Sequence, residues 1–119
     1  MKGVSNLGAE KTFENKVKDY IEDHNGWQVK FFANRMTKRG IPDILSNING
    51  YFVAIEVKAE NGEPSELQKY HRRKINETGG IAIILYPSQY GQFKQLVKCL
   101  NENNRSAALQ LASLINERS

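Results

Sequence analysis

An asparagine–glycine pair between two short apolar runs constrains the fold more than any other feature of this sequence. The runs cover residues 43–48 and 51–58, and Asn49 and Gly50 separate them. A two-residue hairpin turn requires positive φ at both central positions, which asparagine and glycine tolerate. The sequence therefore predicts an antiparallel β-hairpin whose register is fixed by this turn.

That register brings two acidic side chains together at the open end of the hairpin. Counting back from the turn places Asp43 opposite Glu56, and the alternation of side chains places Lys58 on the same face. Opposed carboxylates repel, so the pairing costs stability unless a cation lies between them. A few oxygen ligands, completed by water and a substrate phosphate, are typical of Mg²⁺. We therefore expect a Mg²⁺ or Mn²⁺ site here, with Lys58 steadying negative charge on phosphorus or orienting the attacking water.

Hydrophobic periodicity and turn residues predict the other elements. The expected fold is α/β, a small mixed sheet of about four strands flanked by helices. One domain spans residues 1–119, with a core at about 9–86 and C-terminal helices at about 88–117. The expected segments are a helix through 13–21 that stops at Asn25, strands 27–32, 43–48 and 51–58, a helix 65–78, a strand 81–86, a helix capped by Ser88 and a helix 106–116.

The hairpin carries a pattern that resembles the PD-(D/E)xK nuclease superfamily, with Gly40-Ile41-Pro42-Asp43 followed by Glu56-Val57-Lys58. It is more similar to the VRR-NUC family (virus-type replication-repair nucleases), in which a helical glutamate precedes these motifs and a helical glutamine follows them. The matching positions are Glu14, Gly40, Pro42, Asp43, Glu56, Lys58 and Gln68. The chain resembles the stand-alone phage type of this family, which is similar to Holliday-junction resolvases and is dimeric.

The resemblance implies a restriction-endonuclease-like core and a metal-dependent DNA endonuclease that hydrolyses phosphodiester bonds. Its DNA is branched or structured, in replication, repair or recombination, and its cofactor is Mg²⁺ or Mn²⁺. The implied metal ligands are Asp43, Glu56 and the backbone carbonyl of Val57, with Glu14 as a third carboxylate, directly or through water. Gln68 reaches toward the site, and a second copy of the chain is the implied protein partner. An RNA substrate and exonuclease action stay open.

Each of these residues also has a structural interpretation. Asp43 could be a turn residue, and Glu56 could form a structural ion pair with Lys58. Glu14 could be a solvated helix residue, and Gln68 could belong to a helix capping box. At the level of the whole chain, the alternatives are a catalytically inactive DNA-binding module with the same fold, or a structural interaction protein.

The charge balance is mildly basic, with 17 Lys and Arg against 13 Asp and Glu. This excess favours an acidic partner such as nucleic acid. Two basic clusters are candidates for phosphate contacts, although a solvated helix face explains such clusters equally well. The candidate DNA-binding residues are Arg35, Lys38, Arg39, Lys69, Arg72 and Arg73. The aromatic side chains are expected in the core rather than in base stacking, namely Tyr20, Trp27, Phe31, Phe32 and Phe52.

Composition also suggests a location. The single cysteine, Cys99, cannot form an internal disulfide. No apolar run approaches the roughly 20 residues that a membrane-spanning helix needs. The first residues lack the apolar core of a signal peptide. A cytoplasmic protein of a bacterium or a phage-infected cell is therefore expected, without a membrane partner.

Overall fold

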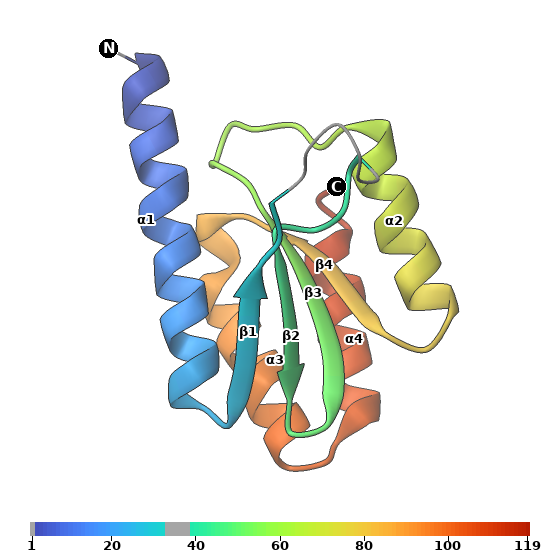
Figure 1. Cartoon of the computed structure of the whole chain (residues 1–119). Helices are drawn as coiled ribbons and strands as arrows, with labels where there is room; N and C mark the ends of the chain where they lie inside the picture. Colours follow the sequence, from blue (N-terminus) through green and yellow to red (C-terminus); the bar gives the residue numbers. More distant parts are fainter. Residues whose placement is uncertain (1, 33–38) are drawn as a thin grey trace.

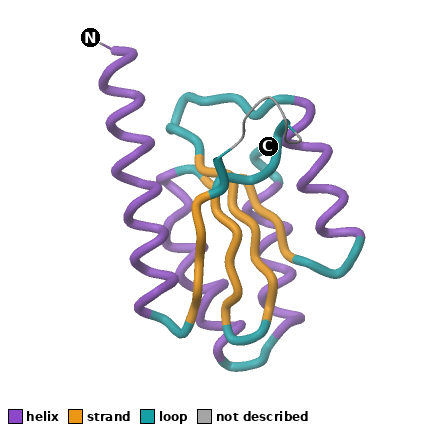
Figure 2. The backbone as a smooth tube through the Cα atoms, in the orientation of Figure 1, coloured by secondary structure: helices purple, strands orange, loops and turns teal. Residues whose placement is uncertain are grey.

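The structure is a computed structural model that describes residues 2–32 and 39–119, with side chains from residue 8 onward. Its helices and strands follow the expected order and form an α/β fold with a mixed sheet (Figures 1 and 2). The elements are α1 (Lys2–Asp23), β1 (Gly26–Lys30), β2 (Ile44–Ile48), β3 (Tyr51–Val57), α2 (Glu66–Glu77), β4 (Ile81–Leu85), the short 3₁₀ helix η1 (Pro87–Gln89), α3 (Tyr90–Asn101) and α4 (Arg105–Asn116). This arrangement is consistent with a small restriction-endonuclease-like core.

The central hairpin has the predicted turn and register. Asn49 and Gly50 adopt φ values of 50° and 90°, as a turn with positive φ at both positions requires. Ile48 lies opposite Tyr51, and the antiparallel ladder continues in the same register to Ile44 and Ile55. The expected position of Asp43 at the open end of the hairpin is thereby confirmed.

The strand order in the sheet is β1-β2-β3-β4, with the first two pairs antiparallel and β3 parallel to β4. A parallel pair needs a crossover connection, and α2 supplies it. All five residues of β4 are buried, which fits the uninterrupted apolar run 81–85. The main core lies on the sheet face that α1, α3 and α4 cover, and it includes Phe13, Ile55, Phe93 and Ile115.

Two asparagine side chains complete the hydrogen bonding of β4. The amide of Ala82 donates to Asn76 Oδ1 at 2.8 Å, and its carbonyl accepts from Asn116 Nδ2 at 2.9 Å. The amide of Ile84 donates to Asn116 Oδ1 at 3.1 Å. Buried backbone groups need such partners, so these contacts hold α2 and α4 against this strand.

One expected helix start is wrong, and one helix is longer than its periodic stretch. The helix predicted through 13–21 is present, and it extends back to Lys2. Ser88 does not cap α3, because Pro87 starts the 3₁₀ helix and Gln89 occupies the N-cap position. The Ser88 hydroxyl instead donates to Glu60 Oε1 at 2.7 Å.

The expectation that the aromatic residues lie in the core is wrong for three of them. Trp27, Phe32 and Phe52 are 62%, 74% and 46% exposed. In Figure 1, α3 and α4 lie behind the sheet and α2 stands beside it, so no helix of the described part covers the front of β1 and β2. Tyr20 does pack against the core, whereas Phe31 is half-buried.

Candidate functional site

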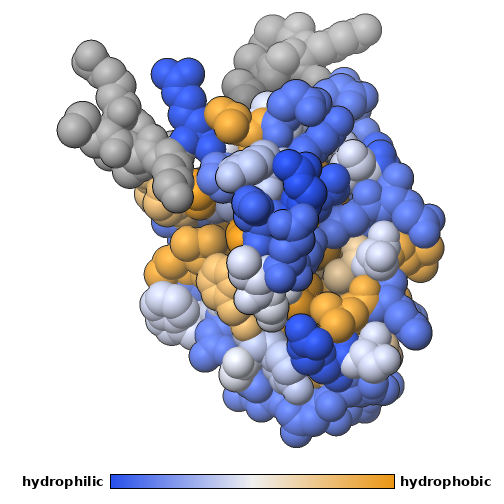
Figure 3. Space-filling view, turned by 90° about the vertical axis from the view of Figure 1, so that its right-hand side faces the viewer, coloured by the Kyte–Doolittle hydropathy of each residue, from blue (hydrophilic) through white to orange (hydrophobic). Residues whose placement is uncertain are grey.

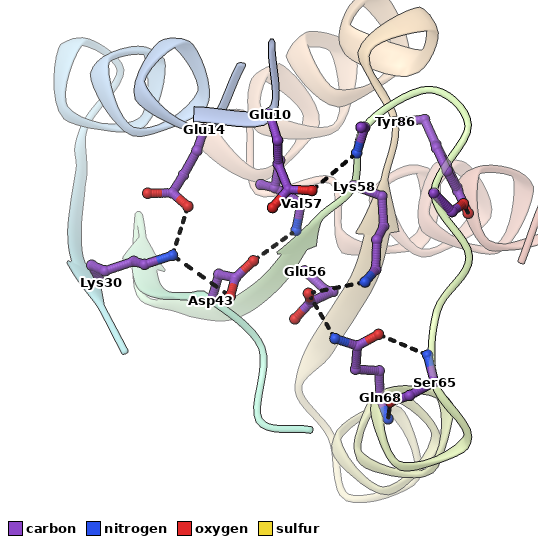
Figure 4. A network of polar contacts seen from close by, with 12 residues as sticks. Glu10, Glu14, Lys30, Asp43, Glu56, Val57, Lys58, Ser65, Gln68 and Tyr86 are labelled. Atoms are coloured by element: carbon purple, nitrogen blue, oxygen red, sulfur yellow. Dashed lines mark hydrogen bonds and ion pairs between the residues drawn. The ribbon is translucent and has the colours of Figure 1, made fainter. Parts of the chain in front are cut away.

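The two acidic residues that the sequence predicts to be neighbours meet at the end of the sheet (Figure 4). Asp43 directly precedes β2, and its Oδ2 accepts a 3.4 Å hydrogen bond from the amide of Val57. Glu56 lies within β3 and is only 5% exposed. The carboxylate of Asp43 is close enough to repel the ionised form of Glu56.

The surroundings of Glu56 disfavour its negative charge. Burial is the largest cause, the charge of Asp43 adds to it, and the nearby Lys58 opposes both, so the pKa of Glu56 rises to about 8. Glu56 Oε1 is buried and has no hydrogen-bond partner among the described residues. Such an oxygen is costly unless something binds it.

The other carboxylate oxygen of Glu56 has two partners. Lys58 Nζ lies 3.8 Å from Oε2, and Gln68 Nε2 donates to the same oxygen at 3.0 Å. Gln68 also completes a capping box. Its side-chain Oε1 accepts a 2.8 Å hydrogen bond from the backbone amide of Ser65, and its backbone amide donates a 3.1 Å hydrogen bond to Ser65 Oγ. Gln68 therefore belongs to the capping box and also contacts Glu56, and its role in a catalytic site stays a prediction.

Glu14 is the centre of a lysine cluster rather than a solvated residue. It is 4% exposed, and its Oε1 accepts a 2.6 Å hydrogen bond from Lys30. Lys18 and Lys11 lie 3.6 and 3.8 Å from Oε2. Lys30 also lies 3.6 Å from Asp43 Oδ1, so Glu14 reaches the acidic pair through this lysine. Although burial raises the pKa of Glu14, the hydrogen bond and the charge of Lys30 outweigh it and lower that pKa.

Replacing Glu14 with Gln is expected to lower the free energy of unfolding by about 1–3 kcal/mol, because the buried carboxylate accepts a hydrogen bond from Lys30 and forms ion pairs with two further lysines. Urea unfolding measures the change. Glu66→Gln is the control, since the side chain of Glu66 is 92% exposed and its ion pair with Lys69, at 3.5 Å, lies on the surface of α2. Equal stability of Glu14→Gln and wild type would mean that Glu14 behaves as a solvated helix residue.

The sequence analysis missed two residues of the site, Lys30 and Glu10. Lys30 lies on β1, on the face opposite Trp27 and Val29. The sequence did not place it near Asp43, because β1 and β2 are not joined by a tight turn from which their register could be counted. Glu10 accepts a 3.3 Å hydrogen bond from the amide of Ala59, and its charge also raises the pKa of Glu56. The spacing of Glu10 one helical turn before Glu14 was the available signal.

The acidic pair offers two carboxylate ligands for a divalent cation, which is only part of the coordination shell that such an ion needs. Asp43 and Glu56 offer adjacent carboxylates, one with an unpartnered buried oxygen. Within residues 2–32 and 39–119, no group of three or more His, Cys, Asp and Glu side chains is arranged to hold a metal ion. An ion at this pair would therefore depend on water and substrate oxygens for its remaining ligands, as Mg²⁺ commonly does. The backbone of Val57 lies beside Asp43, and the role of its carbonyl as a ligand stays a prediction.

Four of the six candidate DNA-binding residues lie in the part of the chain that the structure describes. Arg35 and Lys38 lie outside the described residues, and Arg39 is exposed. The other three line a groove of about 620 Å³ between α2 and α4, which contains none of the acidic pair or Lys58. Within this groove, the guanidinium of Arg72 donates hydrogen bonds to the side chains of Asn116 and Ser119. Besides Lys69, Arg72 and Arg73, α2 contributes Glu66, Asn76 and Glu77 to the groove, and α4 contributes the remaining side chains.

No protein-family model matches this chain, and no curated protein matches it. Among the described residues, no helix is both long and apolar enough to cross a membrane.

Proposed function

We propose that this protein is a metal-dependent DNA endonuclease that hydrolyses phosphodiester bonds. The observation that carries the proposal is the meeting of Asp43 and Glu56 at the end of the sheet, beside Lys58. The unpartnered oxygen and the raised pKa of Glu56 support it, because a buried carboxylate beside a second carboxylate is costly unless a cation binds it. The mildly basic composition and the resemblance to VRR-NUC nucleases favour DNA as the substrate. The single cysteine, which cannot form an internal disulfide, favours the cytoplasm as the location.

In the proposed reaction, water attacks phosphorus in line with the leaving oxygen, which leaves a 5′-phosphate and a 3′-hydroxyl. A divalent cation held by Asp43 and Glu56 would polarise the phosphoryl oxygen and lower the pKa of the attacking water. Lys58 stabilises negative charge that develops on the phosphoryl group or orients the water. Gln68 holds one oxygen of Glu56 at 3.0 Å, which leaves the other oxygen free for the ion. Lys30 holds the Asp43 carboxylate from the side of α1.

A cleavage panel tests the proposal. Linear, nicked, flapped and four-way DNA are each incubated with the protein in Mg²⁺, in Mn²⁺ and in EDTA. The expected result is cleavage of a branched or nicked substrate with either metal and none with EDTA. DNA binding without cleavage in any metal would favour the inactive DNA-binding module, and absence of binding even at about 50 mM salt would reject a nucleic-acid role.

A further inference from the structure

The side chains on the uncovered front of the sheet form rows that lead away from the acidic pair. Register pairs Leu45 with Ala54 and Asn47 with Phe52. Alternate residues of a strand share a face, so both rows lie on the same face as Asp43. The row of Asn47 and Phe52 lies about 13 Å along the strand from Asp43, which is the length of about four stacked nucleotides. A strand of DNA held at the acidic pair can therefore reach this row.

Two exposed aromatic rings stand in the row next to the hairpin turn. Trp27 of β1 is paired with Asn47, so that Trp27, Asn47 and Phe52 follow one another across three strands. Trp27 and Phe52 are 62% and 46% exposed. Aromatic rings exposed on an uncovered sheet are a common platform on which unpaired bases stack. Such stacking requires bases with open faces, which a single strand offers and a duplex does not.

A hollow of about 400 Å³ adjoins Trp27 at the hairpin end of the sheet. Asn47 is exposed and lines this hollow, so its amide can hydrogen-bond to the edge of a base. Glu22 lines it as well, and its carboxylate accepts a 2.8 Å hydrogen bond from Gln28. This negative charge would repel a phosphate. The hollow therefore suits an uncharged base rather than the sugar–phosphate backbone.

The lack of charge on this face also favours bases over a duplex. The two rows nearest the hairpin, from Trp27 to Phe52 and from Val29 to Ala54, contain no charged side chain. Proteins hold a duplex mainly through its phosphates, with Lys and Arg side chains. A face of aromatic, aliphatic and amide groups offers no such contacts, but it offers stacking and hydrogen bonds to exposed bases.

A cation for the phosphates lies at the border of this face, on α2. Asn76 hydrogen-bonds to β4, so Leu67 and Lys74 lie on the other flank of the helix, toward the open strands. The ion pair of Lys74 with Glu77, at 3.7 Å, is half exposed on both sides, so a phosphate can compete for the ammonium group. Figure 3, which views the side that carries α2, shows a hydrophilic band with hydrophobic areas on both sides of it. Bases on the sheet and phosphates along α2 fit this arrangement.

We propose that the uncovered front of the sheet binds unpaired nucleotides of the DNA substrate, with bases stacked on Trp27 and Phe52. We call this surface, made by Trp27, Val29, Leu45, Asn47 and Phe52, the stacking face. The inference rests on the proposed nuclease function and adds the substrate class, which is DNA with an unpaired strand next to the cut. The flapped DNA of the cleavage panel has such a strand, whereas the nicked and four-way DNAs are paired, so the flapped DNA is the expected best substrate.

The fluorescence of Trp27 tests the contact directly, because the chain has a single tryptophan. The protein is titrated in EDTA, at about 50 mM salt, with a single strand of about 12 nucleotides and with the blunt duplex of the same sequence. EDTA prevents cleavage, so the signal reports binding alone. We expect the single strand to quench the fluorescence to saturation and the duplex to leave it nearly unchanged. Absence of quenching by the single strand would overturn the stacking face.

Substitutions separate stacking from hydrophobic contact, with the anisotropy of a labelled single strand as the readout. Trp27→Leu and Phe52→Leu are each expected to weaken binding about tenfold, because they remove a ring and keep an apolar side chain. Trp27→Phe keeps a ring and is expected to stay within about threefold of the wild type. Leu114→Ala is the control for position, since Leu114 is as exposed as Phe52, at 46%, but lies on α4. Circular dichroism confirms that each variant is folded.

The stacking face and the nuclease proposal can fail separately. Preferred cleavage of nicked or four-way DNA over flapped DNA would overturn the stacking face and leave the nuclease, as would equal single-strand affinity of Phe52→Leu and wild type. Absence of cleavage in any metal, with quenching of Trp27 intact, would overturn the nuclease and support the face as a single-strand binding surface. A fall in sedimenting mass in Phe52→Leu, at unchanged single-strand affinity, would assign the face to a protein contact instead.

Discussion

Asp43→Asn is expected to reduce cleavage about a thousandfold or more while the protein stays folded and binds DNA at least as tightly as the wild type. The asparagine side chain has the same shape and can still accept the 3.4 Å hydrogen bond from the amide of Val57. Lys30 keeps its 2.6 Å bond to Glu14. The variant therefore removes a charge next to the proposed ion and the phosphate, and it leaves the local packing in place.

Initial rates on the best substrate of the cleavage panel, together with band-shift affinities in EDTA, measure both effects of Asp43→Asn. Asp19→Asn is the matched control, because it makes the same chemical change at an exposed position of α1. Full activity of Asp43→Asn would remove this residue from the mechanism. Unfolding of the variant would make Asp43 a structural turn residue, as its alternative interpretation states.

The second large effect is on stability, and it comes from the pKa of about 8 for Glu56 in the folded protein. Below pH 4.5, Glu56 is protonated in both the folded and the unfolded chain. Between pH 4.5 and 8, the unfolded chain loses this proton while the folded protein keeps it, so the free energy of unfolding falls as the pH rises. Above pH 8 both forms are ionised and the loss levels off, at on the order of 4 kcal/mol.

Glu56→Gln is expected to remove this pH dependence and to raise the midpoint of thermal unfolding at pH 8 by about 10 °C or more in EDTA. Mg²⁺ is expected to stabilise the wild type at pH 8 and to have little effect on the variant, because an ion that binds only the folded state raises its stability. Glu66→Gln, at a fully solvated carboxylate, serves as the control. Parallel pH profiles for wild type and Glu56→Gln would contradict the buried, repelled carboxylate.

The sequence predicted the acidic pair because its determinants are local. Asn49 and Gly50 fix the turn, the turn fixes the register, and the register places Asp43 at the end of the hairpin next to Glu56. The capping box of Gln68 was predicted for the same reason, since it spans only residues 65–68, whereas the reach of Gln68 toward the site was expected only from the family resemblance.

Features that depend on contacts between distant segments were not predicted. Lys30 joins Glu14 to Asp43 only because β1 pairs with β2, and no short turn connects these strands. Trp27 and Phe52 are of residue types common in cores, but they are exposed because no helix of the described part covers the front of β1 and β2. Ion binding likewise depends on water and substrate, which the sequence does not encode.

Isothermal titration with Mn²⁺ in the absence of DNA measures the central claim most directly. Wild type, Asp43→Asn and Asp19→Asn are titrated at pH 8, where Glu56 readily gives up its proton. We expect one Mn²⁺ per chain for wild type and Asp19→Asn, and at least about tenfold weaker binding for Asp43→Asn. Absence of Mn²⁺ binding by the wild type, or equal binding by Asp43→Asn, would contradict the shared ion.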